Sequence, residues 1–424
     1  MNRAVFWSAL ERALPRAASA VILLLFAALV VPDAVGVYSI ALLAVTFLQS
    51  AFELSMRQFA VGLVRSESGL RIIRRFQVVY LTSGVVLVLG VLAVLELIGA
   101  APTVWIASLL PLILVPGLGA LAIRAVAELQ RSGRWRLLAQ LQTGAAAVGL
   151  GVGVPVVLVT GSPLGPALFA ATSEGVFAIL AVRFASRLPR SELDSSGDGA
   201  RTLRGFVAVG ASSVLTWVQL NLDRLLIALL AGPAVLGLYT LAWSLSRSGA
   251  DAVSAASSNV LRPQLFEASE VGRSGAERMA MEHVIKNAAT LVFLGGAVVS
   301  IVALTILPQI LGQEWQGAID AIPAMVSPTV LALLEALLVV VLVTRGQGAR
   351  LLPVRGAAIL LALPVALAAT VSIESAAWVM VARQALTLVL MLILTWGAVS
   401  VRVIALVVAY FAVLLGIAVL PVIL

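Results

Sequence analysis

The sequence predicts an all-α integral membrane protein with about 13 transmembrane helices, arranged as two six-helix lobes and one additional C-terminal helix. The first reason is composition: 61% of the 424 residues are apolar and 11% are charged, against about 45–50% and about 25% in soluble domains. Together with a mean hydropathy of +1.10, this excludes a soluble globular chain. The second reason is that the apolar residues form long blocks, which favour spanning helices over membrane β-strands. The third is the distribution of basic residues between the blocks.

Each apolar block has a length suited to crossing a bilayer, for which about 20 helical residues are needed. In chain order the blocks are approximately 17–31, 36–53, 76–98, 103–127, 137–160, 164–185, 205–231, 235–260, 284–311, 318–343, 354–372, 375–399 and 402–424.

Basic residues occur in every second loop, as in Arg71, Arg131, Arg187, Arg345 and Arg402. The alternate loops contain neither Lys nor Arg; they are 32–35, 99–102, 161–163, 232–234, 312–318 and 373–374. Because basic loops stay in the cytoplasm, the N-terminus is predicted inside and, after thirteen crossings, the C-terminus outside. The net charge of +8 is explained by this topology, so no nucleic-acid partner is expected.

An internal repeat predicts the two lobes. Residues 32–41 match 233–242 at a constant offset, with Pro, Gly, Tyr and Ala at equivalent positions. An offset of six spans preserves direction through the membrane, as in transporters built from parallel repeats. The predicted domains are therefore an N-lobe (1–186), a cytoplasmic linker (187–204), a C-lobe (205–399) and an additional helix (400–424).

Enzyme chemistry is not expected. The chain has no cysteine and one histidine, so neither a metal site nor a cofactor is predicted. A Gly-rich phosphate loop with a lysine is absent, and no serine, histidine and acid are arranged for nucleophilic catalysis.

Charged residues inside the predicted spans are candidate site residues, because an ionised group there costs about 2.5–3.5 kcal/mol even on the lenient scale. At about 1.5 Å per helical residue, Arg224, Arg247, Arg383 and Glu174 lie about 12–17 Å below the outer surface, whereas Glu335 lies deeper, toward the cytoplasm. One interpretation is that Asp223 and Asp251 neutralise the neighbouring arginines. The other is that the arginines bind an anionic substrate group, for which the planar guanidinium is suited.

Two further pairs have alternative interpretations. Trp217 and Trp243 lie well inside spans, where they either pack or stack on sugar rings. Arg12 and Arg16 either begin an interfacial helix or line the cytoplasmic mouth of a substrate path.

Several motifs resemble one family of membrane proteins. Gly-x-Tyr-x-x-Ala occurs at 36–41 and 237–242, an apolar run with Asp223 and Arg224 ends the seventh span, and a Gly-Pro turn follows at Gly232. With 53–65, these motifs resemble the polysaccharide-transporter (O-antigen type flippase) branch of the multidrug/oligosaccharidyl-lipid/polysaccharide exporter superfamily. The chain departs from it in having Glu53-Leu54-Ser55 instead of Asp-x-Gly, and 13 spans instead of 12 or 14.

The resemblance implies a flippase in the bacterial cytoplasmic membrane that translocates a polyprenyl-diphosphate-linked oligosaccharide for surface polysaccharide biosynthesis. Its implied partners are the lipid-linked glycan, the bilayer, and the polymerase and glycosyltransferases of the same pathway. One alternative is a multidrug or organic-cation antiporter of the same superfamily. A membrane glycan polymerase is less favoured, because the longest predicted external loop, 312–318, is too short to house its chemistry.

Overall fold

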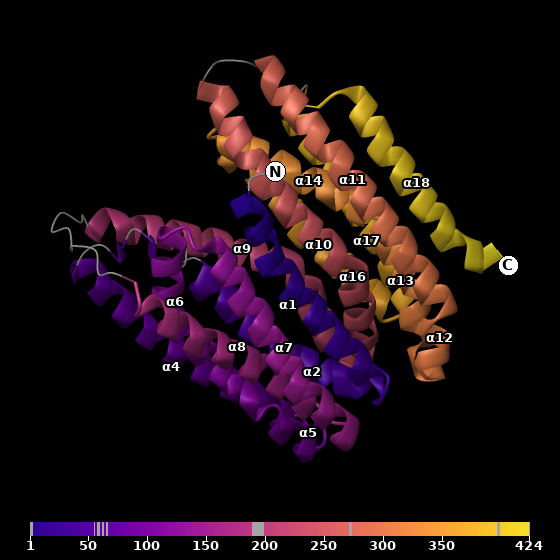
Figure 1. The fold of residues 1–424 in the computed structure, drawn as a ribbon. Coiled ribbons are helices and arrows are strands. Elements are labelled where there is room, and N and C mark those ends of the chain that lie inside the picture. The colour runs from indigo at the N-terminus through magenta and orange to yellow at the C-terminus, as the bar shows by residue number, and fades with distance from the viewer. Residues whose placement is uncertain are drawn as a thin grey trace. The chain divides into compact units, whose positions relative to one another are not determined.

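The computed structural model describes residues 3–54, 56, 60–61, 63–64, 67–188, 199–270, 274–396 and 399–423. Secondary structure in these residues is helical, which confirms the predicted fold class (Figure 1). All thirteen apolar blocks fall on helices. Ten described helices are long and apolar enough to cross a membrane, or eleven if one bent pair is a single span. The first block is a shorter apolar helix, Leu14–Ala27, and the eighth lies in a helix with several polar and charged residues near its middle.

The helices pack into two units, Val21–Leu225 and Met1–Ala20 with Leu226–Leu424, here called the N-terminal and C-terminal units. The predicted linker, 187–204, precedes the boundary between the two units, which falls between Leu225 and Leu226. Residues 189–198 of it lie outside the described residues, and 199–204 form the first turns of a helix.

The N-terminal unit contains the following helices in chain order: the end of α1 (Arg3–Ala27), α2 (Pro32–Leu48), η1 (Gln49–Leu54), α4 (Glu67–Leu97), α5 (Thr103–Ser108), η2 (Leu110–Ile113), α6 (Leu114–Arg131), α7 (Trp135–Thr160), α8 (Leu164–Ala185) and most of α9 (Gly199–Leu230). Its core includes apolar residues of α6, α7 and α8, such as Val126, Leu138 and Phe177.

Glycines allow α7 and α8 to lie side by side (Figure 1). Gly153 of α7 faces Gly165 and Phe169 of α8: a Cβ added at Gly153 would lie 2.8 Å from the Phe169 Cβ and 2.9 Å from the Gly165 carbonyl oxygen. Small residues at such crossings are typical of membrane helices. Gly161 then ends α7 with a left-handed φ of 52°, as glycine does most readily.

The C-terminal unit contains most of α1, the end of α9 and the following helices in chain order: α10 (Gly232–Glu270), α11 (Ser274–Thr305), α12 (Leu307–Ile310), η3 (Gln313–Trp315), α13 (Gln316–Val326), α14 (Thr329–Thr344), η4 (Gly348–Arg350), α15 (Leu351–Leu360), α16 (Ala362–Ala369), α17 (Ile373–Leu394) and α18 (Val401–Ile423). α13 and α14 form the bent pair, at 47°. α10 and α17 both pack against α13 and α14, and α18 packs against α11.

The repeat is visible at the start of α2 and α10. Pro32 and Pro233 lie in the first turn of these helices, where proline is tolerated because the N–H it lacks would have no helical partner. The equivalent tyrosines, Tyr38 and Tyr239, are both buried.

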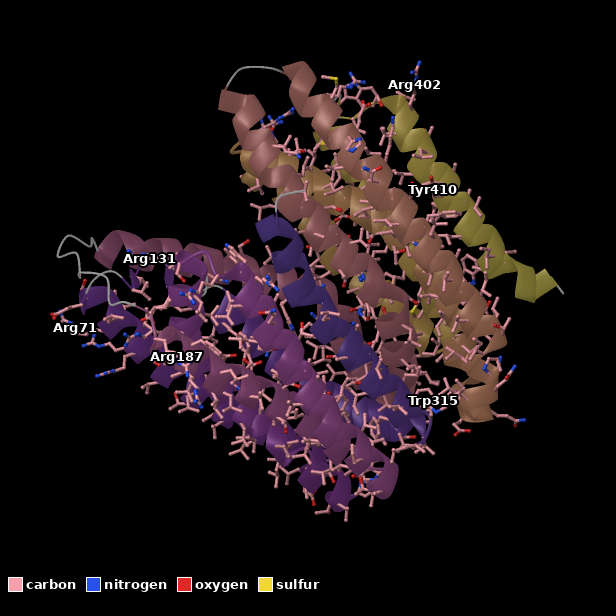
Figure 2. The ribbon with its side chains drawn as sticks, in the orientation of Figure 1. Arg71, Arg131, Arg187, Trp315, Arg402 and Tyr410 are labelled. Atoms are coloured by element: carbon pink, nitrogen blue, oxygen red, sulfur yellow. The ribbon has the colours of Figure 1, made fainter. Side chains whose placement is uncertain are left out.

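Within each unit, the positions of the labelled loop residues agree with the predicted sides of the loops. Arg71, Arg131 and Arg187, from three loops predicted on the cytoplasmic side, lie toward the same end of the N-terminal unit (Figure 2). In the C-terminal unit, Arg402 and Trp315 lie at opposite ends. The Trp315 side chain is fully buried within the protein at its end of the unit.

Reporter fusions test the predicted orientation. Fusions within 312–318 and after Leu424 should both report the outside, and a fusion next to Arg350 should report the cytoplasm, because positively charged loops are retained there. A cytoplasmic signal from the fusion after Leu424 would contradict the assignment of the last three spans.

Candidate functional site

Three of the predicted site residues form a stripe on α10. Trp243, Arg247 and Asp251 are spaced four residues apart, so they share one helix face. The Arg247 Nη2 lies 3.4 Å from the Asp251 Oδ1, and the Arg247 guanidinium carbon lies 4.5 Å from the centre of the Trp243 ring. The Arg247 side chain is 16% exposed and that of Asp251 is 43% exposed. The arginine is therefore held between an acid and an aromatic face.

Trp243 is also part of an aromatic pair. Its ring stacks on that of Tyr239 at 6.2 Å and 18°, and the Tyr239 hydroxyl donates to the Met380 sulfur of α17 at 3.3 Å. These contacts account for Trp243 as a packing residue that connects α10 with α17. Stacking on a sugar ring stays a prediction.

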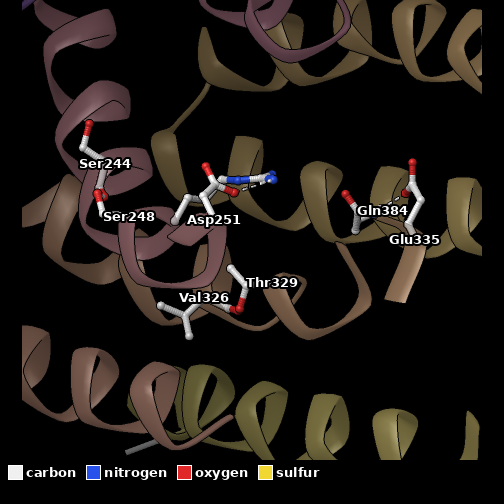
Figure 3. Close-up of polar contacts among 8 residues, drawn as sticks. Ser244, Ser248, Asp251, Val326, Thr329, Glu335 and Gln384 are labelled. Carbon is white, nitrogen blue, oxygen red and sulfur yellow. Dashed lines mark hydrogen bonds and ion pairs between the residues drawn. The ribbon is translucent and has the colours of Figure 1, made fainter. Parts of the chain in front are cut away.

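Glu335 of α14 completes this site. Its Oε2 accepts a hydrogen bond from the Gln384 Nε2 at 2.6 Å (Figure 3). The same oxygen accepts a second one from the Thr387 Oγ1 at 3.0 Å, and both donors lie on α17. Arg247 and Arg383 lie on α10 and α17, both of which pack against α14.

We call Arg247, Asp251, Glu335, Arg383 and Gln384 the arginine–glutamate cluster. It contains two cationic and two anionic side chains, drawn from three helices of one unit. Separating an ionised group from its partners in an apolar interior is strongly unfavourable, so mutual compensation stabilises the cluster.

Sequence reasoning named Glu335 as a charged residue inside a span but did not single out Gln384 and Thr387 as its partners. The depth predicted for Glu335 treats 318–343 as one straight span. The helix is bent between α13 and α14, so residue counts from its end do not measure depth. A usable signal was present in α17, where the polar residues at 383, 384 and 387 share a face of an otherwise apolar helix.

Arg224 and its neighbours lie in the N-terminal unit. Asp223 is fully buried, and its Oδ1 accepts a hydrogen bond from the Arg224 backbone N–H at 3.0 Å. The Arg224 Nη1 lies 3.5 Å from the Asn221 Oδ1. The Trp217 indole donates to the Thr46 hydroxyl at 3.2 Å and packs edge-on against Phe47. These contacts join α9 to α2 and give Trp217 a packing role.

Glu174 of α8 lies beside a second carboxylate. Its Oε1 and the Glu53 Oε2 both lie within 3.5 Å of the point where a Cβ of Gly119 would be. Glu53 also accepts a hydrogen bond from the Tyr80 hydroxyl at 3.2 Å. Glu174 thus belongs to a polar group in the N-terminal unit that also includes Glu53 and Tyr80.

The first helix, α1, contains two of the predicted site residues, Arg12 and Arg16. Arg16 is exposed on α1, whereas the side chain of Arg12 lies outside the described residues. Within the described part of the chain, no group of three or more His, Asp or Glu side chains could hold a metal ion.

A family model described as "Polysaccharide biosynthesis protein" matches residues 25–320, more than half of the chain. The chain belongs to this family. The membership confirms the resemblance inferred from the motifs around 36–41 and 222–242. No curated protein matches the sequence.

Solved structures of the MOP superfamily share the fold. A MATE family multidrug resistance transporter, inward-facing, has a TM-score of 0.66 at 13% identity, covering 94% of this chain and 98% of the other. The lipid II flippase MurJ, inward closed, has a TM-score of 0.69 at 11% identity, covering 96% and 95%. A MOP transporter from Pyrococcus furiosus, whose binding pocket is described as having reverse polarity, has a TM-score of 0.64 at 15% identity, covering 95% and 96%. This polysaccharide biosynthesis protein is therefore a multi-pass membrane protein with a MOP-superfamily fold.

Proposed function

We propose that this protein is a flippase that moves a polyprenyl-diphosphate-linked oligosaccharide from the inner to the outer leaflet of a bacterial cytoplasmic membrane by alternating access. The observation that carries the proposal is that Arg247 of α10 and Arg383 of α17 lie on two largely apolar helices that both pack against α13 and α14. Two guanidiniums in one unit suit a diphosphate, since each can form charge-assisted, bidentate contacts with phosphate oxygens. Family membership supports a substrate from polysaccharide biosynthesis.

The internal sequence repeat supports alternating access. The repeat at 32–41 and 233–242 favours two related lobes, and transporters of this kind move one lobe against the other around the substrate. In the proposed mechanism, the charged headgroup and sugars pass between the lobes while the lipid tail stays in the bilayer. The polymerase and glycosyltransferases of the same pathway act after and before this step, and the chain itself catalyses no bond change.

A second candidate is an organic-cation antiporter, favoured by the likeness to a multidrug resistance MATE transporter. Asp251 and Glu335 could contact a cation. The two arginines beside them oppose this function, because like charges repel a cationic substrate. A flippase requires the arginines, whereas a cation exporter would work as well or better without them.

Transport by reconstituted protein tests the proposal. Vesicles containing the full chain and a lipid-linked oligosaccharide should expose the glycan to an external sugar-modifying reagent faster than protein-free vesicles do. A deletion strain should accumulate the lipid-linked oligosaccharide on the cytoplasmic leaflet. Normal glycan exposure in that strain, together with cation efflux by the purified protein, would overturn the proposal in favour of the antiporter.

A further inference from the structure

We propose that the first turns of α4 form a binding site for the headgroup of an anionic phospholipid, and that Arg71, Arg74 and Arg75 hold its phosphate. These three residues are called the arginine triad below. The site lies on the surface of the N-terminal unit, away from Arg247 and Arg383. It is therefore independent of the proposed flippase function.

The arginine triad lies on the face of α4 that points away from the rest of the N-terminal unit. α4 packs against α2 and α6. The residues that it buries recur at intervals of three, four or seven: Gly69, Ile73, Tyr80, Gly84, Val88, Leu92 and Leu95. The three arginines are exposed, and their spacing of three and four residues places them on one face. At 100° per residue, this face is opposite the buried one.

The same face of α4 becomes apolar one turn after the arginine triad. Val78 and Val79 follow Arg74 and Arg75 by four residues and are exposed, and Val86, Leu89 and Leu97 are exposed further along the helix. Residues 76–95 include no charged residue. At about 1.5 Å per residue this stretch is about 30 Å long, which equals the thickness of the hydrocarbon core. When the stretch spans that core, the triad lies at the level of the headgroups.

The positive charge at the start of α4 is not compensated within the described part of the chain. Residues 67–77 contain three arginines and one acid, Glu67. No arginine of the triad forms an ion pair with another described residue. Like charges three or four residues apart repel each other. Arg131 and Arg187 lie toward the same end of the unit as Arg71 (Figure 2) and add further positive charge. A bound anion relieves this repulsion.

The combination of charge and apolar surface identifies the anion as part of a lipid. A phospholipid places its phosphate at headgroup level and its acyl chains directly below, so one molecule can contact both Arg74 and Val78. The guanidinium forms charge-assisted, bidentate contacts with phosphate, and the apolar stem of an arginine can lie along an acyl chain. A soluble acidic protein or a free phosphate ion would gain nothing from the exposed Val78 and Val79.

The position of the site favours the phospholipid of the bilayer over a lipid-linked glycan. The triad faces away from α2 and α6, so it offers no enclosed path for a sugar chain. On the predicted orientation the triad is cytoplasmic, and anionic lipids of the inner leaflet attract basic residues next to a span. The bound lipid would neutralise the like charges at the start of α4 and thereby stabilise this helix in its membrane position.

Native mass spectrometry of the purified full-length protein tests the inference. The protein is titrated with phosphatidylglycerol and, separately, with phosphatidylcholine of the same acyl chains. Each basic residue near an anionic lipid strengthens binding by about fivefold. The triple variant Arg71→Gln, Arg74→Gln and Arg75→Gln should therefore bind the first phosphatidylglycerol roughly 100-fold more weakly than the wild type, with unchanged binding of phosphatidylcholine. Lysine at all three positions keeps the charge and should retain most of the affinity.

A matched variant separates a defined site from general attraction to a basic surface. Arg131→Gln, Arg134→Gln and Arg187→Gln together remove the same charge near the same end of the unit, but from positions that do not share the face of Val78 and Val79. This variant should lose less than about tenfold. An equal loss in the two triple variants would overturn the inference, as would unchanged affinity in the triad variant.

Two further measurements decide the ligand and the integrity of the variants. A short-chain prenyl diphosphate that binds the triad more tightly than phosphatidylglycerol, or inorganic phosphate that binds it equally well, would overturn the assignment to a phospholipid. Because the three arginines are exposed, the glutamine variant should melt at the wild-type temperature in lipid-free detergent. Phosphatidylglycerol should then raise the melting temperature of the wild type and of the lysine variant more than that of the glutamine variant. An equal rise in all three proteins would contradict the site.

Discussion

Alanine in place of Arg247 or Arg383 is expected to slow flipping of the lipid-linked oligosaccharide by roughly 10- to 150-fold. Each guanidinium that contacts the diphosphate contributes about 1.5–3 kcal/mol as a charge-assisted hydrogen bond. If that energy is used in the transition between states, its loss appears as this rate factor. Lysine at either position keeps the charge but loses the planar fork, so it should restore transport only in part. Glycan exposure in reconstituted vesicles measures the effect.

A matched control exists on α11 of the same unit. Arg278 and Glu282 form an i,i+4 ion pair at 3.2 Å, with side chains 52% and 23% exposed. Solvent-exposed pairs of this kind contribute about 0–1 kcal/mol. Arg278→Ala should therefore leave transport close to that of the wild type, although it breaks the same type of pair as Arg247→Ala.

The double variant Arg247→Ala with Asp251→Ala distinguishes the two interpretations of Arg247. If Arg247 only neutralises Asp251, removing both groups should restore transport, because neither charge is then left without its partner. If Arg247 contacts the diphosphate, the double variant should stay as slow as the single one. The equivalent pair in the N-terminal unit is Arg224→Ala with and without Asp223→Ala. Normal transport by both double variants would contradict the proposed substrate site.

The helices could be predicted from the sequence because the information that specifies them is local. A membrane span needs about 20 apolar residues in a row, and the thirteen blocks satisfy or approach this condition. Contacts within one helix could also be predicted from the sequence. The spacing of Trp243, Arg247 and Asp251 predicts a shared helix face, and the distances between their side chains confirm it.

Contacts between different helices could not be predicted from the sequence in this way. Glu335 and Gln384 are 49 positions apart in the sequence, and their hydrogen bond depends on how α14 and α17 pack and on the bend before α14. The 47° bend occurs where Pro328 follows Ser327, and a proline there does not specify how far α14 turns. Counting residues from a helix end consequently could not pair Glu335 with Gln384 and Thr387.

Substitution of Gly153 by alanine is expected to destabilise the protein by about 1–3 kcal/mol, the range for overpacking a well-packed interior. The added Cβ would lie 2.9 Å from the Gly165 carbonyl oxygen, and because this atom belongs to the backbone of α8, relief requires a helix to shift. Two positions earlier, Gly151 is exposed and has no atom within 4 Å of its Cβ position. Gly151→Ala is therefore the matched control, on the same helix and in the same glycine-rich run.

Thermal unfolding of the two variants in detergent measures this difference. Gly153→Ala should melt at a lower temperature than the wild type, and Gly153→Leu lower still, because the larger side chain must separate α7 from α8 further. Gly151→Ala and Gly151→Leu should melt near the wild-type temperature, since their side chains point to the surface of the helix pair. Equal melting of the Gly153 and Gly151 variants would show that α7 and α8 do not depend on this close approach for their packing.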